Sequence, residues 1–280
     1  MLKRLLKRAY HSPVTNPLRR LYFANRFFGT YYRRRLTQML RLSFISSEIT
    51  NFTYDLTELN ENYLVHVVVL VTGKPFSVIR GYIAEARCDT ALRAHIDKGL
   101  RARGQEPSPA DCPFGRRLGW YALARALKPG VIVETGVDRG HGSVLLCAAL
   151  LRNAQEGRGG RYFGTDINPA AGWLLDGPYA SVGKILYGDS LASLAALDEK
   201  IDLFINDSDH SADYEYREYR AVCDKLAPDS VIVGDNAHVT DRLMRFSEET
   251  GRRFIYFQEE PKNHWYPGGG IGIAFSAAAG

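Results

Sequence analysis

The sequence predicts an α/β protein built on a seven-stranded, mostly parallel sheet with an antiparallel last strand, preceded by a helical region. Three observations support this prediction. From Phe114 onward, short apolar runs alternate with stretches of helical periodicity, the pattern of βαβ units. Most of these runs end at an acidic residue, and the first is followed by a glycine-rich turn. The last two runs are joined by a loop instead of a helix, as in an antiparallel pair.

The individual elements follow from the spacing of apolar residues and from turn residues. Strands are expected at 131–134, 162–166, 184–187, 201–207, 231–235, 253–259 and 270–275. Helices are expected at 118–127, 143–152, 169–175, 191–197, 212–226 and 240–251. Upstream, Thr57 is the expected N-cap of a helix that Gly73 ends, and further helical stretches lead to a proline-rich loop at 101–113.

Length and composition suit one large α/β domain with a smaller appendage. The chain has 280 residues, of which 45% are hydrophobic and 24% charged, ordinary values for a globular protein. We expect a basic, aromatic-rich helical arm at 1–47, a small helical subdomain at 48–112 and the α/β domain at 113–280. The four cysteines form no C-x-x-C pair, and no apolar run approaches the roughly 20 residues of a membrane span. A cytoplasmic location is therefore expected.

The arm is strongly basic, whereas the rest of the chain is mildly acidic. Residues 1–47 contain 11 Lys or Arg and no acid, and the remaining residues carry 25 basic and 31 acidic side chains. Pro13 and Pro17 are expected to interrupt its helical pattern. Aromatic residues and arginines without acids suit an anionic membrane surface, contacted through residues 1–41. Docking on the body or on a second copy is an equal alternative, and nucleic acid is less favoured.

One stretch organises the expected site: Val131-Ile-Val-Glu-Thr-Gly-Val-Asp-Arg-Gly-His-Gly-Ser143. Glu134 ends a strand, Gly136 and Gly140 form a turn, and Ser143 opens a helix. Glycine lets a ligand approach the backbone closely, and a helix N-terminus offers free N–H groups. The spacing differs from the G-x-G-x-x-G of dinucleotide sites, because position 138 is Asp. A nucleoside ligand without a pyrophosphate is therefore expected.

Acidic residues near the ends of later strands strengthen this expectation. Ligands of open α/β sheets bind at the carboxyl ends of the strands. Asp166 ends the second expected strand, where a carboxylate can accept bonds from both ribose hydroxyls, and Asp189 is placed to accept from an adenine amino group. Helix capping is an alternative explanation for one or two of these acids.

Over residues 114–280 these motifs resemble those of the class I S-adenosylmethionine (SAM) dependent methyltransferases. The resemblance implies a Rossmann-like seven-stranded sheet and SAM as the cofactor. The cofactor-binding residues that it implies are Glu134, Gly136, Gly140, Ser143, Asp166, Asp189 and Asp207.

Three residues with hard oxygen ligands also follow two neighbouring strands: Asp207, Asp235 and Asn236. Ligation by oxygen alone suits Mg²⁺ or a similar divalent cation. The arrangement is similar to that of the divalent-metal-dependent O-methyltransferases of the catechol and caffeoyl-CoA type. The order D-x-D-H at 207–210 also resembles the macrocin O-methyltransferase group, which modifies sugars. An Asp-Asn turn without an ion is the alternative.

The O-methyltransferases of the catechol type have a lysine base three residues after their metal-binding Asp. This sequence has His210 at that position. Histidine titrates near neutrality and suits a general base, although a helix-start residue is the alternative. His238 is expected near the same site as a substrate contact or as another helix-start residue. Trp265 and Tyr266 are expected to form a wall of an acceptor pocket or to anchor their loop.

We therefore expect a SAM-dependent O-methyltransferase, assisted by Mg²⁺, that acts on a hydroxyl of a sugar, a glycan or another vicinal diol. It is expected in the cytoplasm, with possible peripheral contact to the inner membrane face, and a homo-oligomer is compatible with the sequence. Two alternatives remain open. One is metal-independent transfer to an O or N acceptor, and the other is a membrane-docked scaffold without turnover.

Overall fold

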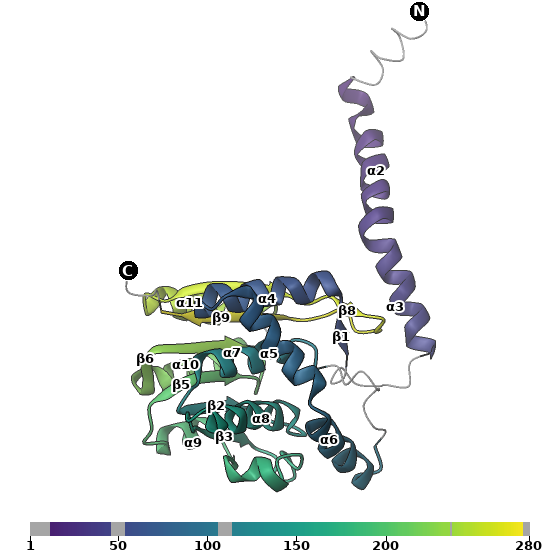
Figure 1. Ribbon diagram of the computed structural model, residues 1–280. Coiled ribbons are helices and arrows are strands. Elements are labelled where there is room, and N and C mark those ends of the chain that lie inside the picture. Colours follow the sequence, from purple (N-terminus) through teal and green to yellow (C-terminus); the bar gives the residue numbers. More distant parts are fainter. Residues whose placement is uncertain (1–11, 46–53, 106–113, 236, 277–280) are drawn as a thin grey trace, which may run out of the picture. The chain divides into compact units, whose positions relative to one another are not determined.

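The computed structural model describes residues 12–45, 54–105, 114–235 and 237–276 (Figure 1). The chain forms two compact units. One comprises residues 1–49 with 263–267, and the other comprises residues 50–262 with 268–280. The second unit contains the sheet and is described first.

The sheet has seven strands in the order β4-β3-β2-β5-β6-β9-β7. All neighbouring pairs are parallel except those of β9, which runs antiparallel to both β6 and β7. The predicted fold class is therefore confirmed. The strands are β2 (Val131–Thr135), β3 (Arg161–Asp166), β4 (Gly183–Tyr187), β5 (Ile201–Asn206), β6 (Leu226–Gly234), β7 (Arg253–Gln258) and β9 (Gly270–Phe275).

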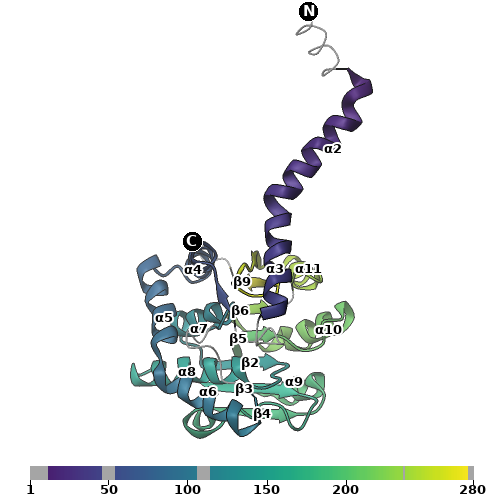
Figure 2. The same ribbon diagram turned by 90° about the vertical axis from the view of Figure 1, so that its right-hand side faces the viewer.

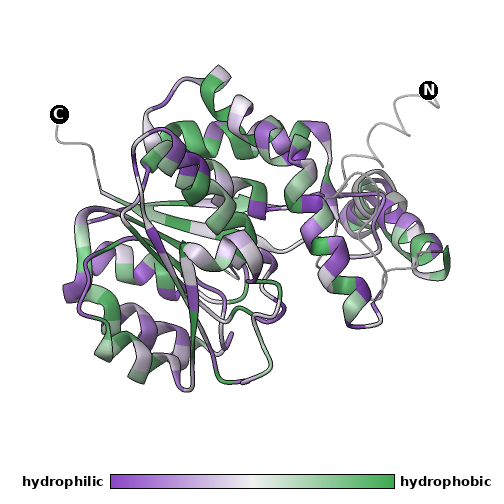
Figure 3. Ribbon diagram, turned by 60° about the horizontal axis from the view of Figure 1, so that its bottom comes forward, coloured by the Kyte–Doolittle hydropathy of each residue, from purple (hydrophilic) through white to green (hydrophobic). Residues whose placement is uncertain are grey.

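Helices cover both faces of this sheet (Figure 2). One face carries α4 (Glu58–Thr72), α5 (Phe76–Cys88), α6 (Thr90–Ala102), α7 (Arg117–Leu127) and α8 (His141–Gln155). The other face carries α9 (Ser190–Ala196), α10 (Ala212–Val222) and α11 (Arg242–Glu249). Strand β2 is buried along its whole length, and the surrounding helices mix hydrophobic and hydrophilic residues, as amphipathic helices do (Figure 3).

Local signals predicted the start and end of α4 correctly. The Thr57 hydroxyl accepts a hydrogen bond from the backbone N–H of Asn60 at 3.3 Å, and Gly73 ends the helix with a left-handed φ of 66°. The helix expected at 169–175 was wrong, because turns and the short 3-10 helix η3 (Gly177–Ser181) follow β3. Gly172 there has a φ of 70°, and its N–H donates to the carbonyl of Asp138 at 2.6 Å, which holds the segment against the glycine-rich turn.

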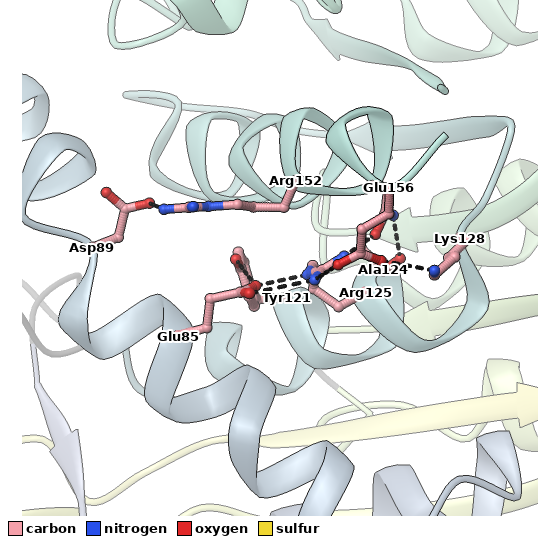
Figure 4. A network of polar contacts seen from close by, with 9 residues as sticks. Glu85, Asp89, Tyr121, Ala124, Arg125, Lys128, Arg152 and Glu156 are labelled. Carbon is pink, nitrogen blue, oxygen red and sulfur yellow. Dashed lines mark hydrogen bonds and ion pairs between the residues drawn. The ribbon is translucent and has the colours of Figure 1, made fainter. Parts of the chain in front are cut away.

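A buried arginine ties the N-terminal helices to the α/β fold (Figure 4). Arg125 of α7 bonds to Glu85 of α5 at 2.6 Å and to Glu156, after α8, at 2.5 Å. Arg152 of α8 adds an ion pair to Asp89, between α5 and α6, at 3.2 Å. These contacts hold α5 and the start of α6 against the α/β fold, within the same compact unit.

The other unit contains the basic arm. Its helical elements are η1 (Pro13–Thr15), α2 (Asn16–Phe27), the π-helical η2 (Phe28–Arg33) and α3 (Arg34–Ile45). Pro17 lies in the first turn of α2 instead of interrupting the helix, because the first helical turn does not need its missing N–H. Residues 1–11 of the expected arm lie outside the described residues. Among the described helices, none is long and apolar enough to cross a membrane.

Candidate functional site

The glycine-rich turn between β2 and α8 adopts the predicted backbone. Gly136 and Gly140 have φ values of 78° and 92°, in the region that favours glycine. A Cβ on Gly136 would also lie 2.1 Å from the carbonyl oxygen of Asp207, so a larger residue cannot fit without moving the end of β5. Gly140 caps α8, which begins at His141, two residues before the expected start. The turn thus presents the helix N-terminus next to the ends of β2 and β5.

Behind the turn lies a buried acid, Glu134, at the end of β2. The Tyr162 hydroxyl of β3 lies 2.6 Å from Glu134 Oε2 and 2.7 Å from Ser143 Oγ. Gly142 leaves room for Glu134, because a Cβ there would lie 2.5 Å from its Oε1. Burial raises the pKa of Glu134 to about 7, against the opposing effect of its hydrogen bond to Tyr162. Glu134 and Ser143 were both expected to bind the cofactor. Both are hydrogen-bonded to the buried Tyr162 hydroxyl behind the turn.

Asp166 lies directly against the turn. Its Oδ2 accepts hydrogen bonds from the backbone N–H groups of Val137 at 3.2 Å and Asp138 at 2.9 Å. Its Oδ1 accepts from the N–H of Asn168 at 2.8 Å. The end of β3 and the glycine turn therefore form one surface, as a ribose-binding carboxylate requires.

Asp189 follows β4 and begins α9. Its Oδ1 accepts a hydrogen bond from the N–H of Leu191 at 3.3 Å and another from the Tyr214 hydroxyl of α10. Helix capping, the alternative kept open for one of the acids, therefore accounts for part of its position. Adenine recognition by Asp189 stays a prediction.

The two acids expected to bind a metal lie together at the ends of β5 and β6. Asp207 and Asp235 are hydrogen-bonded to each other. Arg116, just before α7, binds both carboxylate oxygens of Asp235 through Nε and Nη2. Burial alone would raise the pKa of Asp235, but the charge and hydrogen bonds of Arg116 hold it at about 2. Burial and the charge of Asp235 raise the pKa of Asp207 well above its usual value.

Two residues extend this buried network. The Nη1 of Arg116 donates to the Tyr54 hydroxyl at 2.7 Å and lies 3.5 Å from Oε1 of Glu259, which follows β7. The Tyr54 hydroxyl donates to the other Glu259 oxygen. Tyr54, Arg116, Asp235 and Glu259 are each at most 6% exposed. One guanidinium therefore contacts two buried carboxylates, those of Asp235 and Glu259, an arrangement that the sequence reasoning missed.

These residues do not fit the expected divalent cation. Both carboxylate oxygens of Asp235 are held by Arg116, whose charge lies where a cation would compensate the acid pair. Asn236, the third expected ligand, lies outside the described residues. Within the described ranges, no three His, Cys, Asp or Glu side chains are grouped to hold a metal ion. We therefore derive no chemistry from a bound metal.

The remaining predicted residues have varied surroundings. His210 is exposed in the loop between β5 and α10. The Nδ1 of His238 accepts the N–H of Gly270 at 3.0 Å. Trp265 and Tyr266 belong to segment 263–267, where their ring centroids lie 6.3 Å apart. Their expected roles at an acceptor site stay predictions.

A second buried acid, Glu218 of α10, joins the ends of the central strands. It is fully buried, and burial raises its pKa. Its carboxylate accepts hydrogen bonds from Thr135 at 3.2 Å, Ser208 at 2.6 Å, Ser190 and Asn206. These donors follow or end β2, β4 and β5, so Glu218 fixes the strand ends that carry the site. The amphipathic spacing of α10 gave no sign of this role.

Comparison with known proteins agrees with this geometry. Residues 133–237 match a family model described as a methyltransferase domain. No curated protein matches the chain. The matched segment begins inside β2, contains the whole glycine-rich turn and runs past Asp235.

Among solved structures, the chain is similar to the O-methyltransferase TomG from Streptomyces achromogenes, involved in tomaymycin synthesis and solved with SAM. The identity is 21%, over 68% of this chain and 91% of that chain, with a TM-score of 0.49. It is similar to an O-methyltransferase from Bacillus cereus in complex with SAH, at 16% identity over 77% and 97%, with a TM-score of 0.44. It is also similar to the SAH-bound methyltransferase PaMTH1 from Podospora anserina, at 14% identity over 82% and 99%, with a TM-score of 0.47.

The segment that matches the family model holds the turn and strand ends from which the candidate site is built. Residues 133–237 of this α/β fold therefore match a methyltransferase domain.

Proposed function

We propose that this protein transfers the methyl group of SAM to a hydroxyl of a small molecule, without a resident metal ion. One observation carries the proposal: the glycine turn and the Asp207–Asp235 pair occupy the carboxyl ends of adjacent strands. The Cβ position of Gly136 reaches the Asp207 backbone, so the turn directly adjoins the acid pair. A donor on the turn and an acceptor at the acid pair would thus be neighbours.

The cofactor side fits SAM. The backbone of Gly136 to Gly140 would lie along the methionine part and ribose, Asp166 would accept from the ribose hydroxyls and Asp189 from the adenine amino group. When bound, SAM supplies an electrophilic methyl group on a sulfonium. The hydrogen bonds of Asp166 to the turn position this carboxylate before any ligand arrives.

On the acceptor side, His210 is the proposed general base. It follows Asp207 by three residues in an exposed loop at the carboxyl end of β5, where an acceptor can reach it. An imidazole can take the proton of a hydroxyl as the methyl group is transferred. Arg116 fixes Asp235 and thereby the polar end of the site. His238 is a proposed contact for a sugar or another acceptor with neighbouring hydroxyls.

The test is transfer of labelled methyl from SAM to panels of sugars, catechols and lipid-linked glycans, each with EDTA and with Mg²⁺. We expect label on a hydroxyl at the same rate in both. A strict need for Mg²⁺ would contradict the metal-independent form, and label on nitrogen alone would contradict the hydroxyl acceptor.

The base is tested by His210→Gln, with His66→Gln as the matched control because His66 is also exposed, on α4. We expect kcat to fall about a hundredfold or more for His210→Gln, the usual contribution of a general base, with SAM affinity unchanged. His66→Gln should behave like the unchanged protein. Equal rates for the two variants would remove His210 from the proposed mechanism.

A further inference from the structure

The arm segment, defined here as residues 16–45, presents large apolar side chains at its surface. In α2, Leu18, Leu21 and Tyr22 share one helical face and are 69%, 68% and 61% exposed. In α3, Leu36 and Leu40 lie one turn apart and are 46% and 53% exposed. An exposed apolar stripe of this length marks an interaction surface.

Two aromatic residues continue this surface between the two α-helices. Phe28 and Tyr32 of η2 stack with their ring centroids 6.1 Å apart, and they are 46% and 63% exposed. Tyrosine combines an apolar ring with a polar hydroxyl and therefore suits the boundary between an apolar phase and water.

The charge of the arm segment has a single sign. Its arginines include the exposed Arg26, Arg33 and Arg41, and residues 16–45 contain no acidic residue. By helical spacing, Arg41 lies on the side of α3 away from Leu36 and Leu40. An apolar face with arginines beside and behind it is the arrangement of a helix that lies in an anionic lipid interface.

We propose that the arm segment binds the surface of an anionic lipid bilayer, with its leucine and aromatic face in the headgroup region and its arginines at the phosphates. Pairing with a second copy along this face would bring arginines together without an acid to compensate them. Binding to nucleic acid would leave the leucine face in water. The surface of a bilayer offers an apolar environment to the leucine face and phosphates to the arginines. None of the described helices is long and apolar enough to cross it.

The experiment is sedimentation of the full chain with vesicles of phosphatidylcholine alone and of phosphatidylcholine with phosphatidylglycerol. We expect binding to the anionic vesicles that weakens as salt is raised, and little binding to the neutral ones. Changing Arg26, Arg33 and Arg41 together to Gln should lower the partition coefficient about a hundredfold, since each cation contributes about fivefold near an anionic surface. The control variant changes three exposed arginines outside the arm segment to Gln, namely Arg158, Arg161 and Arg253.

The apolar face is tested separately by Leu36→Ser with Leu40→Ser. We expect at least a tenfold loss of binding to anionic vesicles, because each leucine loses the methine and two methyl groups that enter the interface. The control pair is Leu59→Ser with Leu70→Ser, two leucines of α4 that are 58% and 65% exposed. All these side chains are exposed, so circular dichroism should show an unchanged fold.

Three results would overturn the proposal. They are no binding to anionic vesicles at low salt, equal binding to neutral vesicles, and arm and control variants that bind alike. A dimer in solution that Leu36→Ser with Leu40→Ser dissociates, without vesicle binding, would instead identify a second copy as the partner.

Discussion

Replacing Arg116 with methionine tests whether its buried guanidinium takes the place of a metal cation at the acid pair. The change removes the bidentate bond to Asp235, the 2.7 Å bond to Tyr54 and the 3.5 Å contact with Glu259, all of them buried. Removing one partner of a buried ion pair typically costs about 3–5 kcal/mol, because the remaining charge has neither solvent nor counter-ion. We expect a loss of this size, measured as the free energy of unfolding in urea.

A double-mutant cycle separates the ion pair from the loss of packing. Asp235→Asn alone leaves Arg116 beside Glu259 and Tyr54, so it should cost less than Arg116→Met. Together the two changes should cost less than their sum, by about 2 kcal/mol or more, because each removes the same interaction. Additive costs, or a loss below about 1 kcal/mol for Arg116→Met, would refute the role given to this ion pair.

Magnesium gives the same variant a second readout. With Arg116 removed, the carboxylates of Asp207 and Asp235 lose their counter-charge and become available to a hard cation. We expect Mg²⁺ to raise the melting temperature of Arg116→Met, because a ligand that binds only the folded state stabilises it. The unchanged protein should melt at the same temperature in EDTA and in Mg²⁺. A magnesium-dependent shift in the unchanged protein would show that its acids already accept the ion.

Three further predictions follow from the buried acids and the turn. Glu218→Ala should lower the free energy of unfolding by about 3 kcal/mol in urea titrations, because four hydrogen-bond donors lose their acceptor; a loss near zero would contradict its role. The pKa of Glu134 rises from 4.5 to about 7, so its stabilising contribution is present below pH 4.5 and is lost as pH rises through 7. Unfolding titrations should show the unchanged protein losing on the order of 3 kcal/mol relative to Glu134→Gln across that window, whereas parallel curves would argue against the shift. Gly136→Ala should sharply lower the melting temperature and SAM affinity, because its Cβ would lie 2.1 Å from the Asp207 carbonyl oxygen; normal melting and binding would show that the turn tolerates a side chain.

Sequence patterns predicted the sheet well, because its signals are local. The strand at 270–275 was predicted with its observed bounds, and the Thr57 cap and Gly73 stop were read from single residues. The prediction of a helix at 169–175 failed because the signal there is not local. The backbone of this segment is set by Gly172, whose positive φ and bond to Asp138 depend on the turn packed against it.

The site was predicted in part. The strand-end acids were found because parallel strands bring their carboxyl ends to one edge of the sheet. The role of Arg116 was missed, because it lies 119 residues before Asp235 and no spacing pattern connects them. One signal was present in the sequence: a group of buried acids needs a counter-charge, and Arg116 and Arg117 stand at the start of an apolar helix. The metal prediction followed the acids alone and left out the guanidinium that binds Asp235.

The most direct test of the account is a calorimetric titration of the full chain with SAM in the presence of EDTA. The account predicts one binding site per chain without added metal, and a large loss of affinity in Asp166→Ala. An absence of binding heat in the unchanged protein, or equal affinity in Asp166→Ala, would contradict the SAM site placed at the glycine turn.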